Sequence, residues 1–168
     1  MKTAPKVALV MGSDSDFERL KPCVKRLKSF GIDVVVRVIS AHRTPDEAER
    51  FAKNAKAEGI EIIIGAAGKA AHLAGVLAAF TTLPVIGIPI KSSTMDGLDS
   101  LLSMVQMPKG IPVATVAIDG SDNAAILAAQ ILALKYGDIA DKLAAFKKQM
   151  AEEVMEKNTK IMQEAEEL

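Results

Sequence analysis

The stretch VALVMGSDSDF, residues 7–17, decides the fold class of this 168-residue chain. It opens with five apolar residues and stops at Gly12, which is typical of a strand buried on both faces. Residues that favour helix starts follow at once, and apolar residues then recur at helical spacing as far as Phe30. A buried strand that leads straight into a helix predicts the first βα unit of a parallel sheet.

The same alternation of strand and helix continues along the chain. We expect strands at residues 7–11, 33–39, 61–64, 84–90 and 112–118, and helices at residues 16–30, 45–57, 70–81, 98–105 and 123–134. This order predicts a three-layer α/β fold in which helices cover both faces of one parallel sheet. Five strands favour the flavodoxin-like (Rossmann-like) strand order 2-1-3-4-5, and the absence of a linker or repeat predicts a single domain over residues 1–168.

Residues 137–168 are predicted to form a long C-terminal helical extension. An apolar stripe runs along this charged segment at Ile139, Leu143, Phe146, Met150, Val154 and Ile161. The helix either lies on its own sheet or reaches a neighbouring subunit. We favour the second interpretation, because the stripe offers more apolar surface than one small domain covers, and we therefore expect a homo-oligomer.

Composition argues against several classes of function. Lys and Arg balance Asp and Glu at 21 each and aromatic residues make up 4%, so we expect no nucleic-acid partner. We find no apolar run long enough for a membrane span and no signal-peptide segment before the first strand, which favours a cytoplasmic location. One cysteine, Cys23, and two distant histidines offer no zinc-ligand spacing, so we expect no metal and a buried Cys23.

The side chains that can carry chemistry follow the strands, where ligands bind in open parallel sheets. After the first strand, Gly12 permits a tight turn, and the hydroxyls of Ser13 and Ser15 can hold a phosphate beside free N–H groups of a helix start. Asp16 can accept hydrogen bonds from two ribose hydroxyls. Helix capping alone is the competing interpretation of these residues.

The segment SAHRTP, residues 40–45, follows the second strand and combines helix-start signals with two side chains that those signals do not explain. We expect Thr44 to cap the next helix and Pro45 to be its first residue. Arg43 suits bidentate phosphate binding. Histidine is the side chain whose ordinary pKa lies nearest neutrality, which favours His42 as a proton-transfer group. An exposed surface pair is the alternative interpretation.

The third and fourth strands lead into loops of different character. Small residues at 65–71 let a planar ligand lie against the backbone, and His72 is either a polar contact of that ligand or a structural histidine. The polar loop at residues 91–97 is either a lid or a subunit contact. One histidine, one arginine, one aspartate and several serines suit cofactor-free proton transfer on a phosphorylated, sugar-containing small molecule.

Four motifs stand in a fixed order: MGSDSD at residues 11–16, SAHRTP at 40–45, AAHL at 70–73, and LDSL at 98–101 followed by VQMP at 105–108. Together they resemble the aminoimidazole ribonucleotide carboxylases of purine biosynthesis, and most closely the class that isomerises N5-carboxyaminoimidazole ribonucleotide. The resemblance covers residues from about Val7 to Leu134. It implies a flavodoxin-like fold, a homo-octamer, an enzyme without metal or cofactor, and movement of the carboxylate from N5 to ring carbon C4.

The resemblance also implies a role for each residue of the predicted site. His42 would be the general acid and base. Ser13 and Arg43 would contact the substrate phosphate, with Ser15 nearby, and Asp16 would hold the ribose hydroxyls. Further substrate contacts would come from Ser40, Ala41, Gly68 and His72, the first three around the base and the carboxylate.

The chain departs from the family pattern at two positions near this region. Lys69 stands where the family usually has glycine and Ala74 where proline is common, which bears on the expected carboxylate contacts. The related class that uses free CO2 usually has lysine in the second motif, so Arg43 favours the mutase over that carboxylase. A non-catalytic phospho-nucleotide-binding module on the same scaffold is the third interpretation, and it would need no His42.

Overall fold

The computed structural model describes residues 4–93 and 95–168, so Thr94 of the predicted polar loop and the first three residues lie outside the described residues. The strands are β1 (Lys6–Met11), β2 (Asp33–Val38), β3 (Ile60–Gly68), β4 (Val85–Ile90) and β5 (Ala114–Thr115). The helices are α1 (Phe17–Ser29), α2 (Pro45–Asn54), α3 (Leu73–Ala79), α4 (Leu98–Val105), α5 (Ser121–Ala133) and α6 (Gly137–Glu166). Most predicted elements are therefore present, with ends shifted by a few residues.

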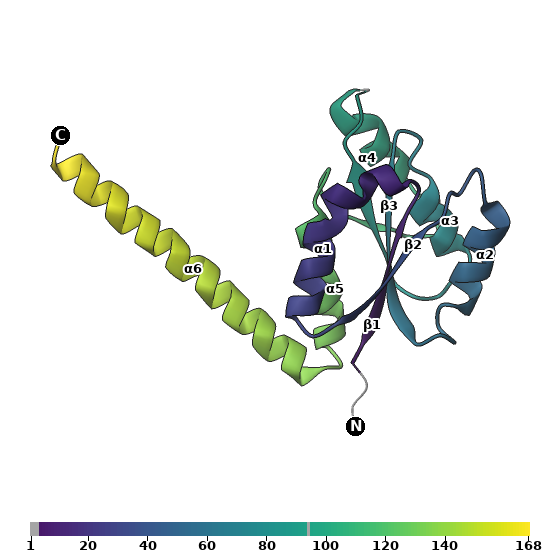
Figure 1. Cartoon of the computed structure of the whole chain (residues 1–168), viewed down its shortest axis with the longest axis horizontal. Helices are drawn as coiled ribbons and strands as arrows, with labels where there is room; N and C mark the ends of the chain where they lie inside the picture. The colour runs from purple at the N-terminus through teal and green to yellow at the C-terminus, as the bar shows by residue number, and fades with distance from the viewer. Residues whose placement is uncertain (1–3, 94) are drawn as a thin grey trace.

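All neighbouring strands pair in parallel in the order β2-β1-β3-β4-β5 (Figure 1), which confirms the predicted flavodoxin-like topology. One hydrophobic core lies between the sheet and α1, α5 and the start of α6. A second core lies between the other face and α2, α3 and α4. These two cores explain why the apolar run of β1 is continuous, because its side chains are buried on both faces of the sheet.

Two strands differ in length from the prediction. β3 continues as far as Gly68 because it lies between β1 and β4, which pair with its backbone on both sides. A Cβ atom at Gly65 would lie 3.0 Å from Cα of Ala74, so the close approach of α3 explains why a glycine can occupy this buried strand. β5 keeps only Ala114–Thr115, since it is the edge strand and Pro112 has no N–H to donate.

Helix α6 packs on the domain only through its first turns. Ile139 and Leu143 are buried against the core, and the ring of Phe146 packs edge-on against Phe30 with centroids 5.9 Å apart. Every residue after Phe146 is exposed, and Figure 1 shows this part of the helix projecting away from the domain. The interpretation in which the whole helix lies on its own sheet is therefore wrong for residues 147–166.

The lone thiol of Cys23 lies in the core on α1 with no exposed surface, which confirms its predicted burial. Burial raises the pKa of this thiol to about 12, so it is protonated and unreactive at neutral pH. Across residues 4–93 and 95–168, no helix is both long enough and apolar enough to span a bilayer.

Candidate active site

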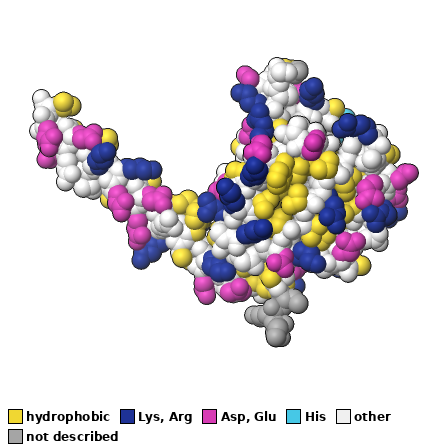
Figure 2. Space-filling view, viewed as in Figure 1, with side chains coloured by type: hydrophobic (Ala, Val, Ile, Leu, Met, Phe, Trp, Pro, Cys, Tyr) yellow, Lys and Arg dark blue, Asp and Glu magenta, His cyan; other side chains and the backbone are white. Residues whose placement is uncertain are grey.

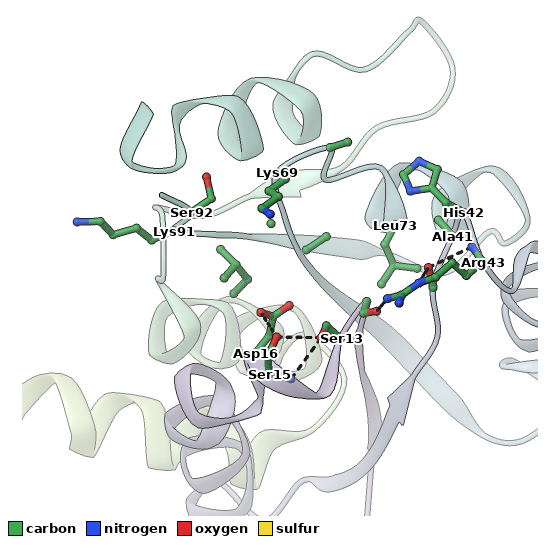
Figure 3. Close-up of a pocket in the computed structure, with 16 residues that line it drawn as sticks. Ser13, Ser15, Asp16, Ala41, His42, Arg43, Lys69, Leu73, Lys91 and Ser92 are labelled. Atoms are coloured by element: carbon green, nitrogen blue, oxygen red, sulfur yellow. Dashed lines mark hydrogen bonds between the residues drawn. The ribbon is translucent and has the colours of Figure 1, made fainter. Parts of the chain in front are cut away.

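A cavity of about 580 Å³ opens at the carboxyl ends of β1 to β4, where the topology predicts ligand binding (Figure 3). Its described walls consist of Gly12, Ser13, Ser15, Asp16, Ser40, Ala41, His42, Arg43, Ala67, Gly68, Lys69, Ala70, Leu73, Ile90, Lys91 and Ser92. Every site residue predicted from the sequence lines this cavity except His72. Four loops that are far apart in sequence therefore share one concave surface.

The turn after β1 presents two hydroxyls and one carboxylate to the cavity. Ser13 Oγ accepts a hydrogen bond from the Ser15 N–H at 3.3 Å, and the two hydroxyl oxygens lie 2.8 Å apart. Burial raises the pKa of Asp16, and the hydrogen bond from Ser15 and the charge of Arg19 offset part of this rise. No side chain caps α1 by a hydrogen bond, so Ser15 and Asp16 are not explained by capping of that helix.

Hydrogen bonds from its own side chains fix the conformation of the loop after β2. Ser40 Oγ accepts hydrogen bonds from the backbone N–H of Arg43 at 3.2 Å and from its Nε at 3.4 Å, and Arg43 Nη2 donates to the carbonyl of Gly12 at 3.4 Å. The Thr44 hydroxyl bonds to both the N–H and the carbonyl of Ser40 at 3.0 Å. The predicted side-chain cap by Thr44 is therefore wrong, whereas Pro45 is the first residue of α2 as predicted.

His42 and His72 form a pair at the edge of the cavity. Nε2 of His42 lies 2.9 Å from Nδ1 of His72, and the rings meet edge to face with centroids 5.0 Å apart. His42 lines the cavity from the loop after β2, whereas His72 sits just before α3 and outside the cavity wall. Because one nitrogen of the pair donates and the other accepts, the contact fixes the orientation of the His42 ring and couples its tautomer to that of His72.

The ends of β3 and β4 form the remaining wall. The chain turns at Lys69 with φ at +55°, and α3 therefore begins only at Leu73 rather than at residue 70. Lys91 Nζ lies 3.4 Å from Asp96 Oδ1, and its backbone N–H donates to Asp119 Oδ1 at 2.9 Å. Asp119 in turn pairs with Arg19, which ties the loop after β4 to α1.

The described part of the chain contains no group of three His, Cys, Asp or Glu side chains that could hold a metal ion. The polar side chains of the cavity wall are serine hydroxyls, the His42 ring, one carboxylate and three cationic side chains. Such a set can bind phosphate and sugar hydroxyls and can move a proton.

The family model described as AIR carboxylase matches residues 6–153. The chain belongs to the AIR carboxylase family. Among the relatives of this family, the N5-carboxyaminoimidazole ribonucleotide mutase of Thermotoga maritima is 54% identical over 159 residues, which cover 95% of this chain and 93% of that protein. The protein of the same name from Pyrococcus abyssi is 57% identical over 146 residues, covering 87% and 84%.

The crystal structure of Treponema denticola PurE has a similar fold, with a TM-score of 0.86 and 32% sequence identity, covering 93% of this chain and 98% of that one. This likeness agrees with the flavodoxin-like topology of the AIR carboxylase chain. Two apolar residues of the cavity wall, Leu73 and Ile90, were not among the site residues predicted from the sequence. Ile90 is the last residue of β4, so its place at the carboxyl edge of the sheet could have identified it.

Proposed function

We propose that this chain is an enzyme that converts N5-carboxyaminoimidazole ribonucleotide to 4-carboxyaminoimidazole ribonucleotide in purine biosynthesis. The relatives from Thermotoga maritima and Pyrococcus abyssi carry the name of that mutase and match nearly the whole chain at more than half of the aligned positions. The observation that carries the chemical proposal is the position of His42 at a cavity that is also lined by Arg43, four serines and Asp16.

The phosphate of the substrate binds between the loops after β1 and β2. Ser13 and Ser15 present adjacent hydroxyls there, and Arg43 reaches across to the carbonyl of Gly12 at 3.4 Å. Guanidinium and hydroxyl groups in this arrangement suit a phosphate dianion. Asp16 lies next along the wall and accepts the ribose hydroxyls, for which a carboxylate has enough acceptor sites.

The imidazole ring lies against the small residues of the neighbouring loops. Ala41 and Gly68 leave room for a planar ring, and Ser40 is within the same wall. A direct contact between His72 and the substrate remains a prediction, since in the structure this side chain bonds to His42.

His42 supplies the proton chemistry. Protonated His42 donates to N5 as the bond from N5 to the carboxyl carbon breaks, which releases CO2 and leaves His42 neutral. C4 of the ring then attacks the trapped CO2, and His42 removes the C4 proton to restore the aromatic ring. The protons therefore balance over the two steps with one residue and no metal or cofactor, and general acid–base assistance of this kind contributes about 10²–10⁴ in rate.

The experiment compares the purified protein with a His42→Asn variant. With N5-carboxyaminoimidazole ribonucleotide, absorbance should report the 4-carboxy product for the wild-type protein, while His42→Asn binds the substrate without turning it over. Conversion only of aminoimidazole ribonucleotide with added CO2 would instead identify the carboxylase reaction. Binding without conversion by the wild-type protein would identify a non-catalytic module.

The functional unit is a homo-octamer in the cytoplasm in this proposal. Exposed apolar side chains at Met150, Val154 and Ile161 on the projecting part of α6 support association between copies. Figure 2 shows a second cluster of hydrophobic side chains over the edge strand β2, where Val38 is 57% exposed. Light scattering should give eight chains for the wild-type protein and smaller assemblies for a Val154→Glu/Ile161→Glu variant, and a wild-type monomer would contradict the proposal.

A further inference from the structure

Lys69 is a cationic side chain on the cavity wall that the family pattern does not explain. The described wall carries three cations, Arg43, Lys69 and Lys91, against one carboxylate, Asp16. Lys91 lies 3.4 Å from the carboxylate of Asp96, which offsets its charge. Within the part of the chain that the structure describes, neither Lys69 nor Arg43 has a carboxylate within ion-pair distance. The cavity therefore holds two cations available to an anionic ligand.

The backbone at Lys69 is unusual for a lysine. Its φ of +55° lies in the left-handed region, where a Cβ atom is unfavourable and glycine is the usual residue. The side chain is exposed to the cavity rather than packed in the core, so its stem contributes no burial that would offset this backbone conformation. A strained position at a ligand cavity points to a role for the side chain.

The two unpaired cations stand at different ends of the cavity. Arg43 follows β2 and Lys69 follows β3, and these strands lie on either side of β1. Parallel strands are about 4.8 Å apart, so β2 and β3, on either side of β1, lie about 10 Å from each other. Figure 3 shows Arg43 beside Ser13, whereas Lys69 lies across the cavity from Ser13 and Asp16. One ligand with two anionic groups separated by a sugar ring matches this spacing.

We propose that Lys69 binds the carboxylate of the carboxylated ribonucleotide and so makes the site prefer carboxylated over uncarboxylated ribonucleotides. This inference rests on the proposed function, in which Arg43 holds the phosphate. The ammonium stabilises the carboxylated ground states, whose negative charge is lost when neutral CO2 forms and the electron pair left on N5 takes the proton from His42. Lys69 therefore lowers KM and Kd for carboxylated ligands and does not raise kcat, because it stabilises the bound substrate and not the transition state.

The test is equilibrium calorimetry with two ligands, 4-carboxyaminoimidazole ribonucleotide and aminoimidazole ribonucleotide, on the full-length protein. Lys69→Met keeps an unbranched side chain only one heavy atom shorter and removes its charge. We expect it to weaken binding of the carboxylated ligand about fivefold, as fits a charged contact at an exposed site, and binding of the uncarboxylated ligand less than twofold. Lys69→Arg should retain the preference. Lys56→Met is the matched control, because Lys56 is exposed just before β3 and Lys69 just after it.

Each other outcome overturns the inference. Equal weakening of both ligands would show that Lys69 holds the phosphate, and no weakening of either would show that it contacts neither group. A fall in kcat at unchanged KM would assign it to the chemical step. If the wild-type protein bound neither ribonucleotide, the proposed function would fail as well. A wild-type protein that binds both with equal affinity would refute only the role proposed for Lys69.

Lys69→Gly separates the role of the side chain from that of the backbone. It removes the ammonium and also relieves the left-handed conformation at φ +55°. We expect a higher unfolding temperature together with the same loss of binding of the carboxylated ligand as in Lys69→Met. A lower unfolding temperature would show that the lysine is present for structural reasons.

Discussion

Replacing His72 with phenylalanine tests whether the histidine pair positions the catalytic group. His72→Phe keeps an aromatic ring for the edge-to-face contact with His42 and removes the hydrogen bond of 2.9 Å between them. A hydrogen bond of this kind is worth about 0.5–1.5 kcal/mol net. At about 1.4 kcal/mol for each factor of ten in rate, kcat should fall roughly 2- to 12-fold.

The loss should appear in kcat and leave KM within about twofold, because His72 does not line the cavity. Initial rates of product formation, followed by absorbance over a range of substrate concentrations, give both constants. Thermal unfolding should change little, since the side chain of His72 is exposed. His72→Asn is the rescue variant, because its amide group can take the place of Nδ1 and restore a bond to His42.

Three results would refute this reasoning in different ways. An unchanged kcat in His72→Phe would show that His42 needs no partner. A rise in KM at constant kcat would support the sequence-based prediction that His72 contacts the substrate directly. Equal losses in His72→Phe and His72→Asn, together with a lower unfolding temperature, would assign His72 a role in folding only.

Three further predictions concern charge and packing at the cavity and elsewhere in the domain. Because burial raises the pKa of Asp16, the folded state binds its proton more tightly than the unfolded state, and this residue costs more stability as the pH rises through its titration range. Asp16→Asn should therefore gain stability relative to the wild-type protein between pH 3 and pH 7, and it should bind ribonucleotide more weakly. Urea titrations in which the two proteins differ in unfolding free energy by the same amount at both pH values would contradict this. Burial alone would raise the pKa of Glu61, but hydrogen bonds from Lys135 and from Tyr136, the latter at 2.6 Å, lower it. Tyr136→Phe should therefore lower the free energy of unfolding by about 1 kcal/mol at pH 7. This loss of stability should shrink as the pH falls through the range in which Glu61 protonates. Gly65→Ala would place a Cβ 3.0 Å from Cα and Cβ of Ala74, so we expect the free energy of unfolding, measured by thermal unfolding, to fall by about 1–3 kcal/mol. The control is Gly137→Ala, whose Cβ meets nothing within 4 Å and which should lose no stability.

The strands of the sheet were predictable from the sequence because each is marked by its own apolar run, and the alternation of five strands with helices favoured the observed order. The lengths of β3 and β5 were not, since they depend on neighbours that the local pattern does not contain. Residues 65–68 have the composition of a turn, yet they extend β3 because β1 and β4 flank them. Residues 112–118 have the composition of a strand, yet only Ala114–Thr115 pairs, at the edge of the sheet.

Some features of the candidate site were likewise predictable from the sequence and others were not. Polar residues in the loops that follow the strands, such as Ser13 and Arg43, were predictable because the carboxyl ends of parallel strands meet at one edge. The bond between His42 and His72 was not, because 30 residues separate them and their contact depends on the turn at Lys69. The role of the Thr44 hydroxyl was misassigned because a helix-start pattern does not show that Ser40 competes for it.

The strand order also explains how two loops from non-adjacent strands can meet. β1 lies between β2 and β3, so His42 and His72 must reach each other above the end of β1. That strand ends at Met11, and a Cβ atom added at the next residue, Gly12, would have no atom within 4 Å. Gly12 lines the cavity together with His42, so the space next to its Cα belongs to the cavity. Any side chain at Gly12 would therefore project into space that the ligand needs. A glycine after the apolar run of β1 keeps this part of the cavity open.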